Sequence, residues 1–332
     1  MSFADVFGTV VDKVIEAPVV TSFTKIGYQV RSRLPGWEDL STASLRGRTV
    51  LVTGGTSGLG LATAEALATL GAEVVITGRQ RERASTVADQ LNQSLPAGAG
   101  SVSGVGADMG ELDAVRALAD ELLANHQSID VLIHNAGALT ADRRENSAGI
   151  EATVASQIFG PFLLTALLLE TLGSSSYKPG RVLTMSSGGM YSAGLTVSGL
   201  EMSAEEYGGS EQYALAKRAQ VTLNEMWASR VPSSDVVFHA MHPGWADTPG
   251  VAESLPKFRK IVGPLLRSPE EGADTMVWLA ADDRPAGCSG EFWLDRTRRS
   301  IHKLPTTKRT DTVELRQELW DRCVEVTGAT AP

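Results

Sequence analysis

From residue 48 onward, short runs of β-branched and apolar residues alternate with longer segments of helical pattern. The short runs predict buried strands, and the longer segments predict helices. The predicted strands cover residues 48–53, 73–77, 101–107, 131–134, 181–185, 236–241 and 291–294. The predicted helices cover residues 59–70, 112–124, 151–172 and 212–229. Because strands that alternate with helices usually pair in parallel, the pattern predicts a single parallel sheet of about seven strands in a three-layer α/β/α domain.

Two further segments flank this domain. Apolar residues recur with helical spacing over residues 1–17, which predicts an amphipathic helix that ends at Pro18. Irregular structure is predicted for Thr21 to Ser44. The expected organisation is an N-terminal extension over residues 1–46, one domain over residues 47–304 and a helical tail over residues 305–332.

The polar face of the predicted N-terminal helix is acidic, with Asp5, Asp12 and Glu16 and one lysine, Lys13. Helices that lie on membrane surfaces usually carry a basic polar face. We therefore expect this helix to dock on its own domain or on the second subunit of a homodimer. A lipid-associated role for residues 1–17 remains the less favoured alternative.

Composition narrows the possible partners. The net charge of −9 leaves no strong cationic surface for a phosphate backbone, so nucleic acid is not expected. Cys288 and Cys323 are isolated from each other and from histidine clusters, which predicts no metal site and fits a reducing, cytoplasmic location. The longest apolar stretch, residues 161–172, is interrupted by Thr165 and Glu170, so it predicts a buried helix and no transmembrane span.

A glycine-rich turn, Thr-Gly-Gly-Thr-Ser-Gly-Leu-Gly over residues 53–60, joins the first predicted strand to the first predicted helix. Glycines let the backbone turn tightly and approach a pyrophosphate, whose negative charge is favoured at a helix N-terminus. This order of elements predicts a Rossmann-type fold with a dinucleotide site. The residues expected to contact the cofactor are Gly54, Thr56, Ser57, Gly58, Leu59 and Gly60. On this motif alone, a tight turn without a ligand remains possible.

The end of the second predicted strand bears on which dinucleotide binds. Folds that prefer NAD place a carboxylate about 20 residues after the glycines, on the ribose hydroxyls. Here that place holds Gly78, followed by Arg79. A guanidinium can pair with a 2′-phosphate, so the sequence predicts NADP(H) as the cofactor. The alternative interpretation is a solvated basic helix start that includes Arg81 and Arg83.

Candidate catalytic residues follow two later strands. Tyr213 and Lys217 are four positions apart on a predicted helix and so share one face. Ser187 follows the end of a buried strand, where α/β sheets bind their ligands. A phenol is a poor acid or base at neutral pH, and we expect the nearby ammonium to lower the pKa of Tyr213 toward the working range.

Together these residues resemble the short-chain dehydrogenase/reductase family over residues 47–294. The resemblance implies hydride transfer between a nicotinamide and a carbonyl or alcohol carbon. In reduction, it implies that Ser187 hydrogen-bonds the carbonyl oxygen, Tyr213 donates the proton, and Lys217 holds the ribose. Further implied cofactor contacts are Asp108 and Met109 at the adenine, Asn135, Ala136 and Gly137 after the fourth strand, and Pro243, Gly244, Trp245 and Thr248 beside the nicotinamide. A Lys-x-Gly-Tyr segment at residues 25–28 and the stretches 185–190, 241–250, 272–276 and 292–296 are similar to the subgroup called dehydrogenase/reductase family member 12.

Three departures from the family pattern stand out. Gln157 takes the place of the family's fourth active-site residue, an asparagine that helps to hold a proton-relaying water. His134 replaces the first asparagine of the Asn-Asn-Ala-Gly element. Tyr213 lies 26 positions after Ser187, about twice the common spacing, and we expect the extra residues, 192–209, to form an exposed flap.

The expected function is an NADP(H)-dependent oxidoreductase that interconverts a lipophilic carbonyl compound and its alcohol. The lipophilic substrate is inferred from apolar residues expected to wall the pocket, namely Met190, Tyr191, Leu195, Trp245, Leu255, Phe258, Ile261 and Leu265. The alternative is a non-catalytic, redox-sensing NADP(H)-binding protein of the same fold, for which Gln157 is the only sequence support.

Overall fold

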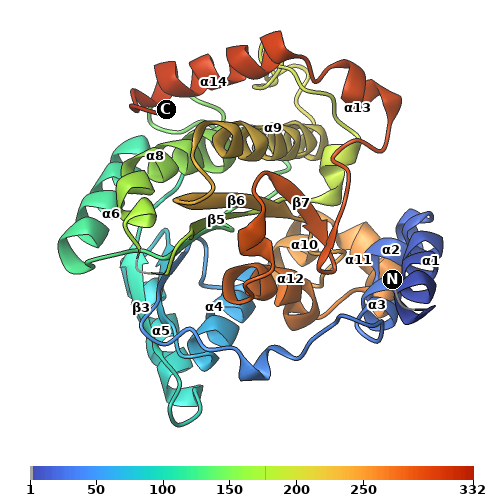
Figure 1. Cartoon of the computed structure of the whole chain (residues 1–332). Coiled ribbons are helices and arrows are strands. Elements are labelled where there is room, and N and C mark those ends of the chain that lie inside the picture. The colour runs from blue at the N-terminus through green and yellow to red at the C-terminus, as the bar shows by residue number, and fades with distance from the viewer. Residues whose placement is uncertain (1–2, 176) are drawn as a thin grey trace.

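The computed structural model describes residues 3–175 and 177–332 and contains one central sheet with helices on both faces (Figure 1). The strand order is β3-β2-β1-β4-β5-β6-β7-β8. The strands are β1 (Thr49–Val52), β2 (Glu73–Gly78), β3 (Ser101–Gly106), β4 (Val131–His134), β5 (Gly180–Met185), β6 (Val236–Met241), β7 (Glu291–Leu294) and β8 (Thr297–Arg298). The first seven pair in parallel, which confirms the Rossmann-type three-layer α/β/α prediction.

The eighth strand was not predicted, and it pairs antiparallel with β7. Asp295 and Arg296 form the connecting turn with positive φ angles of 50° and 55°. A two-residue hairpin loop of this kind is common, but a strand of two residues is too short to produce a hydrophobic period.

The helices form two layers (Figure 1). One face of the sheet carries α4 (Gly58–Thr69), α5 (Arg81–Ser94) and α12 (Pro269–Ala281). The other carries α6 (Leu112–Asn125), α8 (Gly160–Gly173) and α9 (Gly209–Arg230), with α14 (Val313–Thr327) packed over α8 and α9. Short elements complete the chain: η3 (Gly188–Tyr191), α10 (Pro249–Ser254), α11 (Pro256–Val262), η4 (Gly263–Leu265), η5 (Pro285–Gly287) and α13 (Pro305–Arg309).

The two-residue period of β1 shows how the core divides between the two faces. Leu51 belongs to the cluster under α6, α8 and α9, whereas Val50 and Val52 belong to the cluster under α4, α5 and α12. All three side chains have no exposed surface. Burial on both faces explains why the strands read as continuous apolar runs.

The strand order fixes where a ligand can enter. β1 pairs with β2 on one side and with β4 on the other, so the order of the strands reverses at β1 and β4. Ligands of open α/β sheets bind outside the carboxyl ends of the strands at such a reversal. The glycine turn follows β1 at this point, and Asn135 follows β4.

The long helix predicted over residues 151–172 is interrupted, which corrects the sequence expectation. It consists of α7 (Ala152–Val154), a π-helical turn η2 (Ala155–Phe159) and α8. Pro161 lies just beyond the turn and lacks the N–H that a regular α-helix would donate to the carbonyl of Gln157. Among the described residues, Ala152–Gly173 is the one segment long and apolar enough to cross a membrane, but 67% of its apolar window is buried inside this fold.

The segment from Thr21 to Ser44 is more regular than predicted. After α1 (Phe3–Glu16) come α2 (Val19–Phe23), α3 (Lys25–Arg31) and the 3-10 turn η1 (Leu40–Thr42). Helices of five and seven residues are too short to show a reliable period and depend on tertiary contacts for their stability. The predicted helix over residues 1–17 is present as α1, and residues 1 and 2 lie outside the described part of the chain.

The extension docks on its own domain through buried ion pairs. Arg31 is 2% exposed and bonds to Asp12 and Glu16 of α1 and to Asp295 of the β7–β8 turn, with N–O distances of 2.7–2.9 Å. Arg267 contacts the same Asp295 through two nitrogens. Asp12 and Glu16 of α1 are therefore turned toward the domain and neutralised, because Arg299 also pairs with Asp12.

Residues 192–209 form the exposed flap that the spacing suggested only in part, over residues 203–206. Ala193, Leu195 and Leu200 are buried, and the guanidinium of Arg218 donates to the carbonyl of Ala193. The C-terminal tail covers this stretch, since Thr310 accepts the N–H of Leu195. The inserted residues are thus packed under a segment about 100 positions later in the chain. Local sequence does not reveal a contact over that separation.

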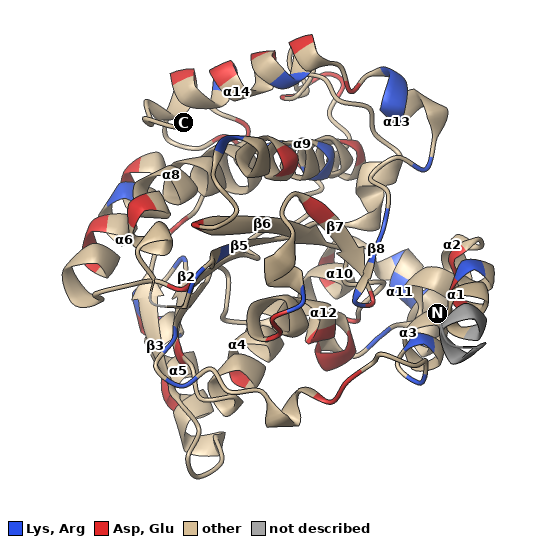
Figure 2. Cartoon of the chain, in the orientation of Figure 1, with Lys and Arg blue, Asp and Glu red and all other residues tan. Residues whose placement is uncertain are grey.

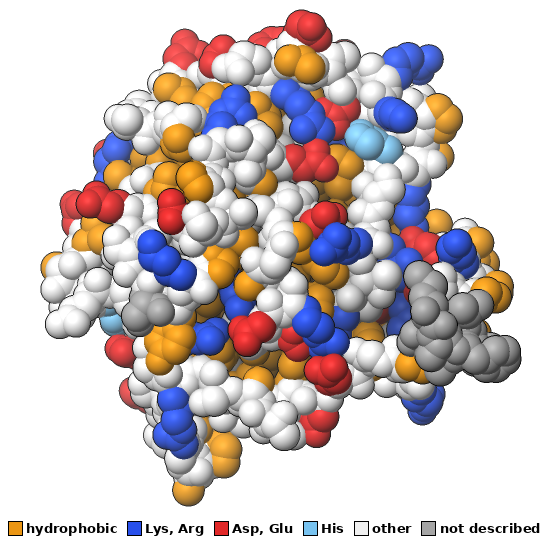
Figure 3. Space-filling model, viewed as in Figure 1, with side chains coloured by type: hydrophobic (Ala, Val, Ile, Leu, Met, Phe, Trp, Pro, Cys, Tyr) orange, Lys and Arg blue, Asp and Glu red, His pale blue; other side chains and the backbone are white. Residues whose placement is uncertain are grey.

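The surface carries both signs of charge. Lys and Arg are interspersed with Asp and Glu over the helices (Figure 2). On the face shown in Figure 3, apolar side chains are scattered among polar and charged ones.

Candidate active site

The glycine turn after β1 is held by a small set of hydrogen bonds. The side chain of Thr53 accepts the N–H groups of Asn135 and Ala136 at 3.0 and 3.1 Å. The Asn135 amide donates to the carbonyls of Thr53 and Gly54. These bonds fix the loops after β1 and β4 against each other, and Thr53 is a supporting residue that the candidate cofactor contacts did not include.

Glycine is required in this turn because backbones approach closely. A Cβ on Gly54 would lie 2.8 Å from the Cα of Ala136, and one on Gly60 would lie 2.3 Å from the amide nitrogen of Asn135. Gly58 has a φ of +56°, which L side chains rarely adopt. Ser57 caps α4 without a side-chain hydrogen bond, so the first-turn N–H groups of a twelve-residue helix point toward the turn. The residues fit a dinucleotide pyrophosphate, whose charge a helix N-terminus stabilises.

The loops after β2 and β3 border the same edge of the sheet. Arg79 is exposed just after β2, whereas Arg81 is bound to Glu121 by two hydrogen bonds. Asp108 follows β3, and one of its carboxylate oxygens accepts the N–H of Gly110 at 2.9 Å. Met109 is 4% exposed and its carbonyl lies under Gly160 of α8. Arg79 is therefore exposed and Asp108 half-buried beside the carboxyl ends of the strands, and the side chain of Met109 is buried.

Ser187 and Tyr213 are brought together at the carboxyl end of β5. Ser187 begins η3, where its hydroxyl accepts the N–H of Gly189 at 3.2 Å. Tyr213 lies in the first turns of α9, and a side-chain hydrogen bond links it to Ser187. Burial of the phenol raises the pKa of Tyr213 to about 12, and the bond to Ser187 opposes this shift. The expectation that the neighbouring ammonium lowers this pKa is wrong for the protein alone, because desolvation dominates.

Lys217 is one helical turn beyond Tyr213 and is 2% exposed. Its ammonium lies 5.2 Å from the centroid of the Tyr213 ring. It donates to the carbonyl of Met185 at 2.9 Å and to the side-chain oxygen of Gln220 at 2.9 Å. Burial lowers the pKa of Lys217 to about 7, so its charge changes within the physiological range.

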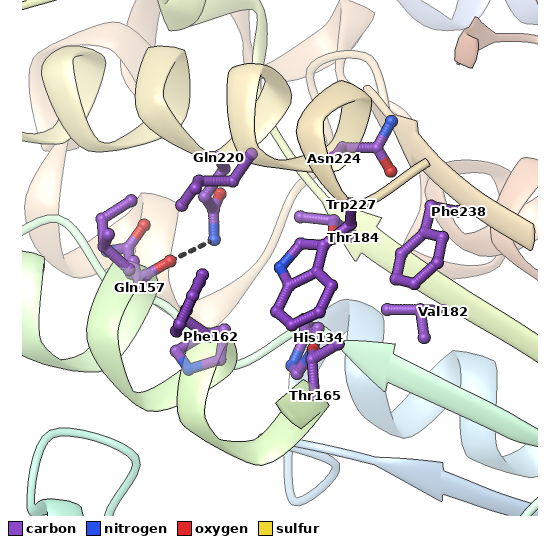
Figure 4. Close-up of a pocket in the computed structure, with 13 residues that line it drawn as sticks. His134, Gln157, Phe162, Thr165, Val182, Thr184, Gln220, Asn224, Trp227 and Phe238 are labelled. Carbon is purple, nitrogen blue, oxygen red and sulfur yellow. Dashed lines mark hydrogen bonds between the residues drawn. The ribbon is translucent and has the colours of Figure 1, made fainter. Parts of the chain in front are cut away.

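Gln157 lies in the π-helical turn, where it is fully buried and close to Gln220 (Figure 4). Its side-chain amide donates to the carbonyl of Ala138 at 3.0 Å, and its backbone carbonyl accepts the amide of Gln220 at 2.8 Å. His134 replaces the family asparagine and is buried beyond them, where burial lowers its pKa to about 3 and its Nε2 bonds to Thr165. Sequence reasoning missed Gln220, although it lies three positions after Lys217, on the same helix face.

The segment after β6 packs against Arg267 and the glycine turn. Gly244 has a φ of +74°, and the guanidinium of Arg267 occupies the space where its Cβ would be. The Cβ of Thr248 lies 3.4 Å from the position of a Cβ on Gly58, so this segment touches the glycine turn. The hydroxyl of Thr248 also caps α10 by accepting the N–H of Val251. Pro243 is buried, and Trp245 is half-buried beside it.

The residues expected to wall the pocket differ in exposure. Met190 and Leu195 are buried, and Ile261 is 81% exposed on α11. Trp245 and Phe258 do pack together, with ring centroids 5.1 Å apart.

The extension contributes to this wall, which the sequence did not indicate. The carbonyl of Phe23 accepts the N–H of Trp245 at 2.7 Å. Its ring packs edge-on against His242 and Trp245, with centroids 4.3 and 5.9 Å away. The Nδ1 of His242 in turn accepts the N–H of Gly188, next to Ser187. His242 therefore has a packing role.

Comparisons with known proteins agree with this geometry. Residues 48–258 match the family model described as short chain dehydrogenase. The chain is 35% identical to human dehydrogenase/reductase SDR family member 12 over 84% of this chain and 86% of that protein. It is 34% identical to human retinol dehydrogenase 14 over 76% of this chain and 79% of that protein. A similar solved structure is that of an NAD(P) dependent protein from Beutenbergia cavernae with bound NADP at low occupancy. The TM-score is 0.61 and the sequence identity is 25%, over 76% of this chain and 96% of that one.

Proposed function

The chain belongs to the short-chain dehydrogenase/reductase family, whose members are oxidoreductases acting on alcohols and carbonyl compounds, and from this premise we propose that it uses NADP(H) to reduce a lipophilic carbonyl compound. The observation that carries the proposal is the contact of Ser187 with Tyr213, one helical turn from the buried Lys217. These groups converge at the carboxyl end of β5, beside the glycine turn. Screening NADPH oxidation against a panel of ketones, aldehydes and quinones tests the activity. Failure to turn over any of them would favour the non-catalytic alternative.

The chain's own residues supply orientation and a proton. A nicotinamide, when bound, supplies or accepts the hydride. Ser187 is positioned to donate a hydrogen bond to a carbonyl oxygen, and Tyr213 to protonate that oxygen. The phenol of Tyr213 is protonated at neutral pH, so it can act as the proton donor in reduction. Lys217 has a donor left for the ribose hydroxyls after its bonds to Met185 and Gln220.

Preference for NADP(H) is proposed from Gly78 and Arg79. No carboxylate stands at this strand end to repel a 2′-phosphate, and Arg79 is exposed without a bond to hold it elsewhere among the described residues. We expect Arg79→Ala to weaken NADPH binding by about tenfold, because a charged hydrogen bond contributes about 1.5–3 kcal/mol and solvent screens part of it. NADH binding should change little. Calorimetric titration of both cofactors measures the difference.

Arg81→Ala is the matched control for this prediction. Arg81 is also a basic residue at the start of α5, but its guanidinium is bound to Glu121. Its replacement should change the affinities for NADPH and NADH equally. Equal affinities of the unmodified chain for NADPH and NADH would contradict the preference.

A lipophilic substrate is supported by two observations. The ring pair of Trp245 and Phe258 lies beside the crevice, and Phe23 backs it from the extension. One relative is named a retinol dehydrogenase, and retinol is an apolar alcohol. Apolar walls with few polar groups favour apolar ligands.

A series of methyl ketones of increasing chain length tests this property. Each buried CH₂ contributes about 0.8 kcal/mol, so kcat/KM should rise by about fourfold per methylene until the pocket is filled. Keto acids of equal length provide the control, since a terminal carboxylate should cancel the gain. Efficiency that stays flat or falls along the ketone series would count against an apolar pocket.

A further inference from the structure

Lys217 is held by two neutral acceptors and has no counter-ion. Its ammonium bonds to the carbonyl of Met185 on β5 and to the side-chain oxygen of Gln220 on α9. Among the described residues, the titratable side chain that faces it is Tyr213, with the ring centroid 5.2 Å away. No charged group is among the causes of the shift in the pKa of Lys217, which burial alone lowers. The two acceptors are therefore what stabilises its charge.

The amide nitrogen of Gln220 is held by a second hydrogen bond. Its amide nitrogen donates to the carbonyl of Gln157 at 2.8 Å, as the dashed line in Figure 4 shows. That carbonyl lies in the π-helical turn, and Pro161 cannot offer it the usual N–H. A buried carbonyl that lacks its helical donor needs another one, and Gln220 supplies it. The Gln220 side chain thus donates to the Gln157 carbonyl and accepts from the Lys217 ammonium at the same time.

Its amide orientation follows from these partners. The ammonium can only donate and the carbonyl can only accept, so the Gln220 oxygen must face Lys217 and its nitrogen must face Gln157. Gln220 is 5% exposed, and its side chain also borders a cavity of about 30 Å³ that His134 and Thr165 line from the opposite side (Figure 4). The burial of His134 lowers its pKa to about 3, so it adds no charge near Lys217 at neutral pH.

We propose that Gln220 is a positioning residue that holds the Lys217 ammonium in place and favours its charged form, by linking it to the π-helical turn at Gln157. The inference rests on the proposed function, in which Lys217 binds the ribose of the cofactor. Gln220 touches neither substrate nor reacting atoms, and it acts through Lys217. Its effect is electrostatic as well as structural, because a hydrogen-bond acceptor favours the charged form of an amine.

The test follows the titration of Lys217 through cofactor affinity, which does not require turnover. The full chain is titrated with NADH between pH 5.5 and 9 by fluorescence, since NADH lacks a 2′-phosphate that would itself titrate. Affinity should fall as pH rises through the pKa of Lys217, near 7, because the ammonium is the stronger donor to the ribose hydroxyls. Gln220→Met keeps the length but removes the acceptor, and should move the midpoint down by about one pH unit. Gln220→Glu places a carboxylate there, and should move it up by at least about one pH unit.

Gln212→Met is the matched control. Gln212 is a buried glutamine on the same helix, and its amide binds backbone groups of Met202 and Leu200. Its replacement removes two buried hydrogen bonds without touching Lys217, so the midpoint should stay where it is. A purely structural role for Gln220 would give the same result in both methionine variants.

An unchanged midpoint in folded Gln220→Met, or an affinity for NADH that does not vary with pH in the unmodified chain, overturns the inference. If Gln220→Met does not fold, Gln220→Glu decides, and an unchanged midpoint in that variant also overturns it. A chain that reduces no carbonyl compound but shows the predicted shifts would reject the proposed activity and leave the role of Gln220 standing.

Discussion

Tyr213→Phe is expected to reduce turnover by at least about 100-fold and to leave NADPH affinity nearly unchanged, because a positioned general acid contributes about 10²–10⁴-fold to rate. The phenol hydroxyl bonds to Ser187 and is the acidic group of the site. Phenylalanine keeps the ring, its packing and its contact with Lys217. The measurement is kcat with the best carbonyl substrate of the panel, together with the NADPH dissociation constant.

Tyr177→Phe is the control for the loss of a phenol as such. Tyr177 donates to the carbonyl of Arg46 at 3.0 Å and precedes β5, whereas Ser187 and Tyr213 meet at the carboxyl end of that strand. Its replacement should lower stability slightly and preserve kcat. A Tyr213→Phe enzyme that works at the rate of the unmodified chain would mean that another group protonates the substrate.

The second large effect is expected on stability. Asp295 is a buried carboxylate, 2% exposed, that neutralises both Arg31 and Arg267. Asp295→Asn keeps the shape and tolerates the positive φ of 50°, but leaves the buried guanidinium of Arg267 without a counter-ion. Breaking one side of a buried ion pair costs about 3–5 kcal/mol, so the free energy of unfolding should fall by about that amount. Urea unfolding of both proteins under the same conditions measures the loss.

Asp247→Asn shows what an exposed pair contributes. Asp247 bonds to Arg259 through both carboxylate oxygens, but both side chains are at least 40% exposed. Such pairs are worth about 0–1 kcal/mol. A loss for Asp295→Asn no larger than for Asp247→Asn would show that the network in the extension does not hold the fold together.

The same network connects the extension to the substrate side of the site. The backbone N–H of Arg267 donates to the carbonyl of Trp245, and its guanidinium bonds to the carbonyls of Ser22 and Thr24. Phe23 lies between these two anchors and touches Trp245 itself. The extension is therefore part of the scaffold that holds the wall around Trp245, although it lies more than 200 residues away in sequence.

Local sequence was enough to predict the sheet and to propose residues for the site. The strands were visible because residues buried on both faces form apolar runs, as Val131–His134 and Val236–Met241 do. Gly54, Ser187 and Lys217 were proposed as site residues because each stands at a strand end or on one helix face in the sequence pattern. Parallel strands then bring those ends to a single edge of the sheet.

Tertiary structure alone decided the features that depend on distant partners. The helices α2 and α3 of the extension are too short to form alone, and contacts such as the ion pair of Arg31 with Asp295 stabilise them. The pKa of Tyr213 rises because burial outweighs its hydrogen bond to Ser187, and burial cannot be read from residue spacing. Gln220 lies three residues after Lys217, but its role depends on the carbonyl of Gln157, 63 positions earlier. Pro161 leaves that carbonyl without the N–H that a regular helix would donate to it. Sequence patterns record which residue faces the core, whereas hydrogen bonding and desolvation depend on what the rest of the chain places against it.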